Sequence, residues 1–268
     1  MRSPVRWVTR YVERSRQATR RCQLEAELAA EWQCRVKLRP ASAKGGYDEI
    51  YYAIHKRRRI AVVRVNNPHK HVDDPIGPED PGVPLGSNDR LDCEWKAYGK
   101  LYPQRLSPEP MWRTHDAIAC SWLNWNRASQ WLTKHRDQFW PTLEQIIPAI
   151  RRMHDLDVIH LDLNLGNILL EPGGAGVVII DFEFGPVDWV SKAQQMAFDY
   201  LRLIDDCIRP RRGGAVMLDD PKRLVELLDT IVVPQAKEAE MRFSLSKLKR
   251  LGKERRFCEQ LRAVFARM

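Results

Sequence analysis

Three polar residues within one short segment have the types and spacing of a metal and phosphate site. The segment HLDLNLGNILLEPGGAGVVIIDFEFG runs from His160 to Gly185 and contains Asp162, Asn167 and Asp181. Transfer of phosphate from ATP needs a carboxylate that orients and deprotonates the acceptor hydroxyl, and oxygen ligands for Mg²⁺. Asp162 fits the first role. Asn167 and Asp181 fit the second, because amide and carboxylate oxygens suit a hard cation.

The residues between these polar groups predict a hairpin that would bring them together. NILL is a short apolar stretch, EPGGAG is rich in residues that tolerate turns, and VVIID is a second apolar stretch that ends at Asp181. Such a hairpin would hold the loops HLDLNLGN and DFEFG side by side. The sequence therefore predicts that Asp162, Asn167 and Asp181 converge on one point at a cleft.

The elements around this segment change character along the chain. Residues 36–67 predict three strands with a Gly turn and the charged turn KRRR between them, and residues 117–122 predict a further strand. Apolar residues at helical spacing predict helices over 90–104, 129–138 and 142–157, whereas 69–89 is rich in proline and acidic residues and predicts a loop. The order indicates a β-rich first part that passes into a mainly helical second part.

The motif residues resemble those of a known superfamily. His160, Asp162, Asn167 and Asp181, which is followed by Phe182, are similar to the catalytic loop and the metal loop of the protein-kinase-like superfamily, HRDxxxxN and DFG. The resemblance implies an α+β, two-lobed protein-kinase-like fold with a β-rich N-lobe and a mainly helical C-lobe. It also implies ATP and Mg²⁺ as cofactors, Asp162 as the catalytic base, and Asn167 and Asp181 as metal ligands.

Further positions can be placed by the same resemblance. Gly45 and Gly46 fall in the Gly-rich loop that covers the phosphates, and Glu94 falls where the superfamily has its ion-pairing Glu. Arg64 stands at the end of IAVVRV, where the superfamily has its phosphate-binding Lys. Asp199 resembles the aspartate of the helix that braces the catalytic loop. Gly45, Gly46, Arg64 and Glu94 are therefore the predicted nucleotide-binding residues.

The replacement of that lysine leaves two interpretations open. Arg64 keeps the positive charge and could pair with Glu94, but its planar fork is placed differently against a phosphate. Lys56, on the adjacent strand, could reach the site instead. Alternatively, the chain is a pseudokinase scaffold that binds a partner or nucleotide without turnover, although such a scaffold has no chemical need for Asp162, Asn167 and Asp181 together.

Departures from the protein-kinase pattern point to an acceptor other than a protein. Leu161 replaces the Arg of HRD, Glu183 replaces the Gly of DFG, and Asn164 replaces the catalytic-loop Lys. The segment from Asp181 to Asp199 is short and has no APE motif. With its HLDLNLGNILL and IDFE segments, the chain most resembles the bacterial lipopolysaccharide core heptose/Kdo kinase family. This resemblance implies phosphorylation of a sugar hydroxyl. RIO-like and aminoglycoside-type phosphotransferases are the alternatives.

Positive charge is concentrated at the two ends of the chain. The net charge is +9 over 268 residues, yet residues 1–40 carry ten basic and four acidic residues, and residues 241–268 carry nine and two. Each end predicts a basic amphipathic helix, which could contact an anionic membrane or be a solvated face. The predicted domains are a basic helix over 1–39, an N-lobe over 40–120, and a C-lobe over 121–268 with a basic C-terminal helix.

Composition limits the remaining classes. No apolar run is long enough to cross a bilayer, and the N-terminal segment lacks an apolar signal region. The six cysteines are scattered without a metal-ligand spacing, which favours reduced thiols in a cytoplasm. The basic ends leave nucleic-acid binding as an alternative, but they show no interleaved aromatic reader that would support it, so nucleic acid is not the partner we expect. We expect an enzyme in the cytoplasm, peripheral on the inner face of the inner membrane.

Overall fold

The computed structural model describes residues 4–41, 48–67 and 76–268. Gly45 and Gly46, predicted to cover the phosphates, lie outside these residues. The chain divides into two compact units. The sheet unit contains the described residues of Met1–Asn67 and Met111–Trp122, and the helical unit contains those of Pro68–Pro110 and Leu123–Met268.

The sheet unit consists of one long helix and an antiparallel sheet. Its helix is α1 (Pro4–Glu31), and its strands follow the order β1-β2-β3-β6-β5. The strands are β1 (Lys37–Pro40), β2 (Glu49–His55), β3 (Arg58–Val65), β5 (Pro110–Arg113) and β6 (Ala117–Ser121). The strands predicted over 36–67 and 117–122 are thus confirmed.

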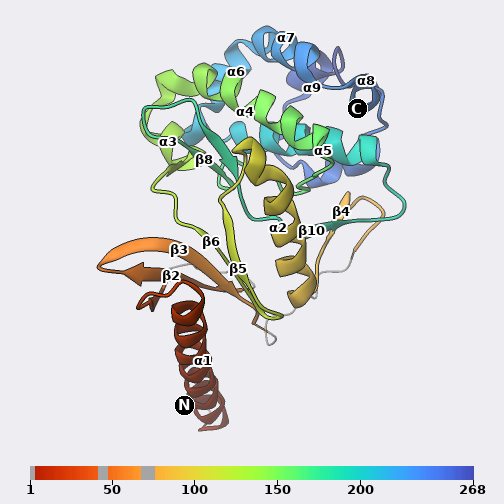
Figure 1. Ribbon diagram of the computed structural model, residues 1–268. Coiled ribbons are helices and arrows are strands. Elements are labelled where there is room, and N and C mark those ends of the chain that lie inside the picture. Colours follow the sequence, from red (N-terminus) through yellow and green to blue (C-terminus); the bar gives the residue numbers. More distant parts are fainter. Residues whose placement is uncertain (1–3, 42–47, 68–75) are drawn as a thin grey trace. The chain divides into compact units, whose positions relative to one another are not determined.

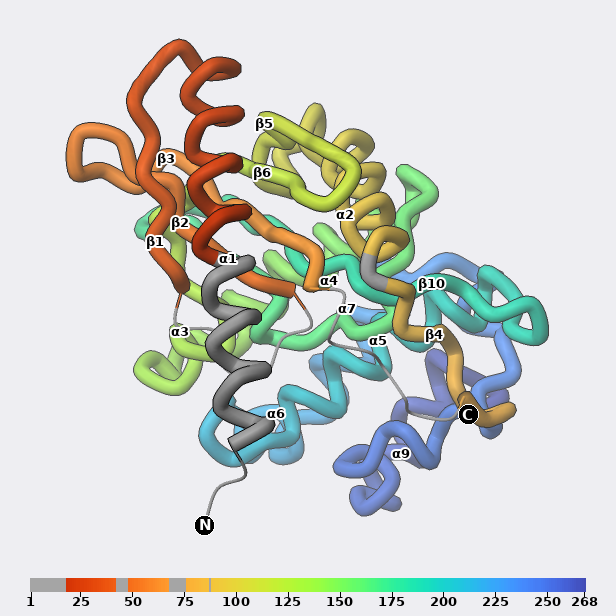
Figure 2. Tube along the Cα trace, turned by 90° about the horizontal axis from the view of Figure 1, so that it is seen from below, coloured from red at the N-terminus to blue at the C-terminus, as the bar shows by residue number. Residues whose placement is uncertain are grey.

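The second half of α1 is part of the core of the sheet unit. Leu24 and Leu28 are fully buried and pack with Ala53, Ala61 and Val63 of the sheet. Figure 2 shows this part of α1 next to β1 and β2. The side chains of Leu24 and Leu28 lie four residues apart, on one face of the helix. The helix is therefore held to the sheet by apolar burial.

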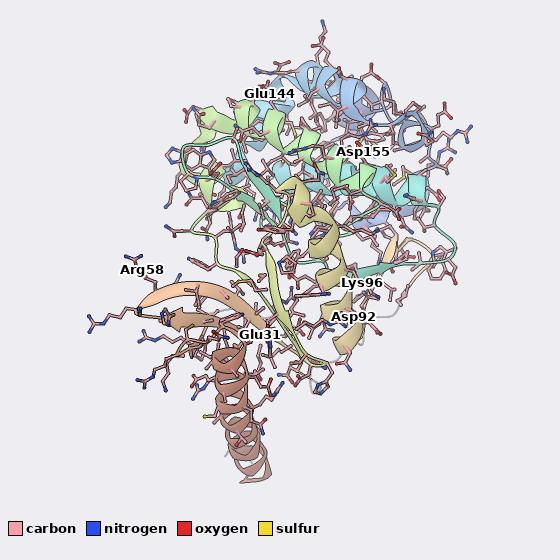
Figure 3. All side chains as sticks on the ribbon, viewed as in Figure 1. Glu31, Arg58, Asp92, Lys96, Glu144 and Asp155 are labelled. Atoms are coloured by element: carbon pink, nitrogen blue, oxygen red, sulfur yellow. The ribbon has the colours of Figure 1, made fainter. Side chains whose placement is uncertain are left out.

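The β2–β3 hairpin places Lys56 and Arg64 at opposite ends. Arg64 pairs with Ile50 near the end of β3, whereas Lys56 lies in the turn beyond the pair His55 and Arg58. Six residues of strand span roughly 20 Å, and Figure 3 shows Arg58 at the tip of the hairpin. The expectation that Lys56 could take the place of the missing lysine near Arg64 is therefore wrong.

The helical unit carries most of the helices, a two-stranded sheet of β4 and β10 and a three-stranded sheet of β7, β8 and β9 (Figure 1). Before the loop of interest lie β4 (Gly82–Pro84), α2 (Ser87–Leu101), η1 (Tyr102–Gln104), β7 (Asn126–Arg127), α3 (Ala128–Lys134), η2 (Arg136–Gln138) and α4 (Phe139–Asp155). After it lie β8 (Ile168–Leu170), β9 (Val177–Ile179), β10 (Phe184–Pro186), α5 (Lys192–Cys207), η3 (Pro210–Arg212), α6 (Gly214–Asp219), α7 (Pro221–Ile231), α8 (Pro234–Lys237), η4 (Arg242–Lys247), η5 (Leu251–Lys253) and α9 (Arg255–Leu261).

Two helices support the loop HLDLNLGN, residues 160–167. The predicted apolar stripe of α4, Leu143, Ile146, Ile150 and Met153, is at most 1% exposed. Helix α5 starts with a capping box in which the Ser191 hydroxyl accepts from the Gln194 amide, which satisfies backbone donors at the helix start. Helices α4 and α5 pack on each other. The antiparallel sheet and the helical unit confirm the predicted α+β class.

Two segments of the helical unit differ from expectation. Part of the predicted proline-rich loop forms β4, which pairs with β10 through Val83 and Gly185. The basic C-terminal segment forms two short 3-10 turns and a seven-residue helix in place of one amphipathic helix. Most of its large apolar residues are buried in the unit, with Leu248, Leu251 and Phe265 fully covered. Among the described residues, no helix has the length and apolar character needed to cross a bilayer.

Candidate functional site

The predicted hairpin exists and fixes both loops that carry the polar residues. Strands β8 and β9 are antiparallel, with Ile168 opposite Ile179. The pairing continues past the strands, because the Ile180 amide donates to the Asn167 carbonyl at 2.9 Å. Asn167 therefore lies across from the residue that precedes Asp181. The sequence pattern correctly predicted this local arrangement.

A buried carboxylate on α5 holds the loop that contains Asp162. The two oxygens of Asp199 accept from the backbone amides of His160 at 3.0 Å and Leu161 at 2.7 Å. His154 Nε2 lies 3.0 Å from Asp199 Oδ2, and Asp199 is fully buried. Leu161 has a φ of 66°, which is strained for a residue other than glycine. The Asp199 contacts stabilise this conformation, as the resemblance implied.

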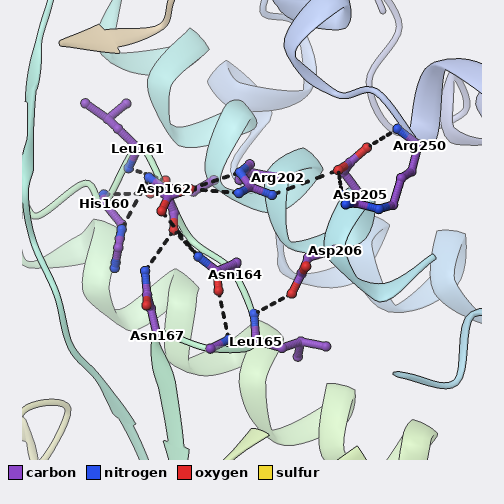
Figure 4. A network of polar contacts seen from close by, with 12 residues as sticks. His160, Leu161, Asp162, Asn164, Leu165, Asn167, Arg202, Asp205, Asp206 and Arg250 are labelled. Atoms are coloured by element: carbon purple, nitrogen blue, oxygen red, sulfur yellow. Dashed lines mark hydrogen bonds and ion pairs between the residues drawn. The ribbon is translucent and has the colours of Figure 1, made fainter. Parts of the chain in front are cut away.

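The carboxylate of Asp162 is bound by an arginine from α5. Arg202 Nε donates to Asp162 Oδ1 at 3.1 Å, and Arg202 Nη2 lies 2.9 Å from the same oxygen. On the other side, Asn164 Nδ2 donates to Asp162 Oδ2 at 3.3 Å. Figure 4 shows the dashed contacts of Asp162 with both partners. The side chain of Asp162 is therefore oriented, yet it keeps 32% of its surface exposed to a substrate.

Burial and charge act in opposite directions on this carboxylate. Desolvation raises the pKa of Asp162 above its ordinary value, and the nearby negative charge of Asp181 adds to the rise. The ion pair with Arg202 opposes this rise, without cancelling it. A base with a raised pKa accepts a proton more readily, which favours deprotonation of a hydroxyl.

Asn167 and Asp181 provide oxygen atoms suited to Mg²⁺. The Asn167 side-chain nitrogen donates to the Asp162 carbonyl at 3.2 Å, so its amide oxygen is the atom that can face a metal. Asp181 adopts a φ of 77°, and its charge acts on Asp162. Within the described residues, no group of three or more acidic, His or Cys side chains is arranged so that it could hold a metal ion by itself. One carboxylate and one amide fit Mg²⁺ that is bound together with substrate phosphates and water.

Arg64 belongs to the sheet unit and Glu94 to the helical unit, and each has contacts within its own unit. Arg64 Nη2 donates to Asp48 Oδ2 at 2.8 Å, and both side chains are buried in the sheet unit. Glu94 lies on α2, is 2% exposed, and accepts a hydrogen bond from the hydroxyl of Tyr98. The predicted pairing of Arg64 with Glu94 therefore stays a prediction.

Arg202 is the residue of this site that sequence reasoning missed. It follows Asp199 by three residues and precedes Asp206 by four, a spacing that puts all three on one face of α5. Asp206 in turn accepts from the Leu165 amide at 3.0 Å. The signal was available, because charged residues that share one face of a largely buried helix indicate contact with something polar. Arg202 supplies the positive charge that Asn164 does not provide.

Comparison with known proteins bears on these residues. Residues 121–204 match the model of the "Lipopolysaccharide kinase (Kdo/WaaP) family", and this range includes Asp162, Asn167, Asp181 and Arg202. No curated protein matched the chain. Among solved structures, the Rio2 kinase-ADP/Mg²⁺-phosphoaspartate complex from Chaetomium thermophilum is 16% identical, with a TM-score of 0.43 over 91% of this chain and 74% of that one.

The family match covers the catalytic loop, the metal loop and the helix that braces them. It confirms the predicted resemblance to the protein-kinase-like superfamily near the lipopolysaccharide kinases, and with it a phosphotransferase that acts on a hydroxyl group.

Proposed function

We propose that the protein transfers the γ-phosphate of ATP to a sugar hydroxyl, of heptose or Kdo, in the core of lipopolysaccharide. The observation that carries this proposal is the family match over the segment that contains Asp162, Asn167 and Asp181. The short connection from Asp181 to α5 adds support. It has little room for a segment that docks a protein substrate.

The three site residues of the helical unit, Asp162, Asn167 and Asp181, have separate roles in this reaction. Asp162, oriented by Arg202 and Asn164, accepts the proton of the sugar hydroxyl as that oxygen attacks the γ-phosphorus. Asn167 and Asp181 would hold Mg²⁺, which neutralises charge on the β- and γ-phosphates when it is bound with ATP. The proton thus passes to Asp162, the sugar oxygen forms the new phosphate ester, and the bond from the γ-phosphorus to ADP breaks so that ADP leaves.

The nucleotide side of the site rests on the resemblance. Arg64 would contact the phosphates of ATP, Glu94 would orient Arg64, and Gly45 and Gly46 would cover the phosphates. The enzyme would act in the cytoplasm, peripheral on the inner face of the inner membrane. Its contact with that membrane would be electrostatic, because most of the large apolar residues of the C-terminal segment are buried in the protein.

Transfer from radiolabelled ATP to purified lipopolysaccharide tests the proposal. We expect Mg²⁺-dependent labelling by the wild type and a loss of at least a hundredfold in Asp162→Asn, because the variant cannot accept the proton. Asp188→Asn is the matched control, since Asp188 is an exposed aspartate of the same unit. Equal labelling by Asp162→Asn and the control would contradict the assignment of the base.

A pseudokinase scaffold is the second candidate, and one observation favours it. The guanidinium of Arg64 is buried against Asp48, so an ATP phosphate would have to share it with that carboxylate. Thermal unfolding with ATP, with and without Mg²⁺, separates the two candidates. At 100 times its dissociation constant, ATP should stabilise the native state by about 2.7 kcal/mol.

An enzyme should show a Mg²⁺-dependent shift that Asp181→Ala loses. The absence of any shift in the wild type would favour the scaffold.

A further inference from the structure

A second feature of the helical unit is a basic cavity beside the catalytic loop. The cavity has a volume of about 640 Å³ and lies between α3 and η3. It is lined by Ser129, Gln130, Thr133, Lys134, Arg209, Pro210, Arg211 and Arg212. Half of these residues carry a positive charge, and none carries a negative one. No role in the proposed reaction has been given to any of them.

The positive charge of this cavity is only partly balanced from behind. Arg209 and Arg212 both contact the buried carboxylate of Asp206. Over the part of the chain that the structure describes, Lys134 and Arg211 form no salt bridge, and both are exposed. Burial lowers the pKa of Arg212, and the nearby charge of Arg209 lowers it further. A bound anion would relieve this crowding of like charges.

The wall of the cavity is hydrogen-bonded to the loop that carries the base. The Ser129 amide donates to the Leu165 carbonyl at 2.9 Å, and the Leu165 amide donates to Asp206, the partner of Arg212. Figure 4 shows Asp206 next to Leu165 of the catalytic loop. Leu165 follows Asp162 by three residues, which span at most about 11 Å. An acceptor of a few sugars could therefore reach from Asp162 to the cavity.

The remaining lining residues indicate what kind of anion fits. The hydroxyls of Ser129 and Thr133 and the amide of Gln130 can hydrogen-bond to sugar hydroxyls. Among the described residues, no aromatic side chain lines the cavity, which removes the stacking that nucleobases generally need. Arg and Lys bind phosphate and carboxylate oxygens through charge-assisted hydrogen bonds. The chemistry therefore matches an acidic saccharide.

We propose that this cavity is an acceptor subsite that binds a phosphate or carboxylate group carried by the sugar chain to be phosphorylated. Arg211 and Lys134 contact the anionic group, and Arg212, fixed by Asp206, completes the basic wall. The subsite selects acidic saccharides over neutral ones and places the reactive hydroxyl at Asp162. This inference rests on the proposed sugar-kinase function, because it assigns the cavity to the acceptor of that reaction.

Steady-state kinetics on two forms of one acceptor test the inference. We would compare lipopolysaccharide with the same material after removal of its phosphates, using wild type and Lys134→Gln/Arg211→Gln. The double variant should raise the KM for intact lipopolysaccharide about tenfold, and leave the KM for ATP within twofold. It should also discriminate less between the two acceptor forms than the wild type does.

The matched control is Lys96→Gln/Lys222→Gln, which removes two exposed charges elsewhere in the helical unit. Equal acceptor KM values in the double variant and the control would overturn the inference, even if both transfer phosphate normally. A binding arm keeps the test independent of turnover. Calorimetric titration with inorganic pyrophosphate should show weaker binding to the double variant than to the control.

The two arms separate the possible failures. If the wild type phosphorylates no lipopolysaccharide but pyrophosphate binding still depends on Lys134 and Arg211, the proposed function fails and the anion site stands without its acceptor role. If pyrophosphate binding depends on these residues while the acceptor KM does not, the ligand is a free anion and the acceptor subsite is overturned.

Discussion

At the scale of single residues, the state of Asp162 is set by two opposing influences. Burial raises its pKa, whereas the ion pair with Arg202 lowers it. The result is a carboxylate whose pKa stays above its ordinary value. The contacts of Arg202 at this site are with the Asp162 carboxylate, and no direct contact with the phosphate or the sugar is assigned to it. It acts through Asp162 and is a positioning residue.

Replacement of Arg202 should therefore change the pH dependence of transfer. If Asp162 is the base, as proposed, it must be deprotonated, so activity should fall as the pH drops through its pKa. Arg202→Gln removes an influence that lowers this pKa, so the pKa rises further and the acidic limb moves to higher pH. The pH profile of kcat/KM measures the shift, because that ratio reports groups of the free enzyme.

Arg223→Gln is the control for this prediction, since Arg223 forms a surface ion pair with Glu144 at 2.6 Å in the same unit. Its acidic limb should coincide with that of the wild type. A merely structural role for Arg202 would lower the rate by the same factor at every pH, and that result would contradict the argument.

At the scale of elements, helix α5 organises the catalytic loop from one face. Asp199 binds the amides of His160 and Leu161, and Asp206 binds the amide of Leu165. Backbone amides in a buried loop need such acceptors, because an unpaired buried donor is costly. The helix therefore replaces the hydrogen bonds that a loop without regular structure cannot make with itself.

Loss of the Asp199 carboxylate should destabilise the fold strongly. Asp199→Ala leaves two buried amides and the His154 side chain without their acceptor, so we expect a loss of roughly 3 kcal/mol in the free energy of unfolding. Urea denaturation measures this quantity. Asp188→Ala, at an exposed site, should change it by no more than about 0.5 kcal/mol. Similar values for both variants would show that α5 does not brace the loop.

Two glycines give a second contrast between elements. A Cβ added at Gly82 in β4 would lie 2.6 Å from Leu161 Cδ1 and 3.0 Å from the Gly185 carbonyl oxygen, whereas one at Gly99 in α2 meets nothing within 4 Å. Gly82→Ala should therefore lower the free energy of unfolding by about 1 to 3 kcal/mol. Gly99→Ala should raise it by about 0.5 to 1 kcal/mol.

Unfolding in urea checks this pair of substitutions. Stabilisation by both would mean that β4 does not pack on Leu161 in solution.

These elements also show what the sequence could and could not predict. The β8–β9 hairpin and the stripe of α4 follow from periodicity and turn residues, and the structure has both. The strand β4 was missed because its partner β10 lies 100 residues away, and no local pattern encodes that pairing. The positive φ of Leu161 was equally hidden, since leucine disfavours it and only the contacts of Asp199 make it tolerable.

The prediction of one amphipathic helix in the C-terminal segment was wrong for a different reason. Leu245, Leu248 and Leu251 repeat every three residues, which fits both an amphipathic α-helix and 3-10 turns. The structure has 3-10 turns there, with Leu248 and Leu251 facing the interior. Periodicity alone could not choose between these forms, because tertiary burial decides which one is stable.

At the scale of the whole molecule, the distribution of charge is the main clue to location. The basic C-terminal segment is tied into the helical unit, since Asp205 accepts from the Arg250 and Leu251 amides and pairs with the Arg250 guanidinium. Its buried leucines are part of the core. Deletion of 241–268 would therefore disturb folding, and a test of membrane contact must change surface charges only.

Four exposed cations of this segment allow such a test, namely Lys249, Lys253, Arg255 and Arg256. Each basic residue near an anionic membrane contributes about 1 kcal/mol. Replacement of all four by Gln should weaken binding of the full chain to phosphatidylglycerol vesicles by about a hundredfold or more, while the melting temperature stays close to that of the wild type. Vesicle flotation at low and high salt measures this binding, which added salt should abolish.

Lys96→Gln/Lys222→Gln controls for the loss of charge elsewhere. Unchanged flotation of the quadruple variant would remove the C-terminal segment as the membrane contact and leave the anionic group of the acceptor as the reason for the basic surface.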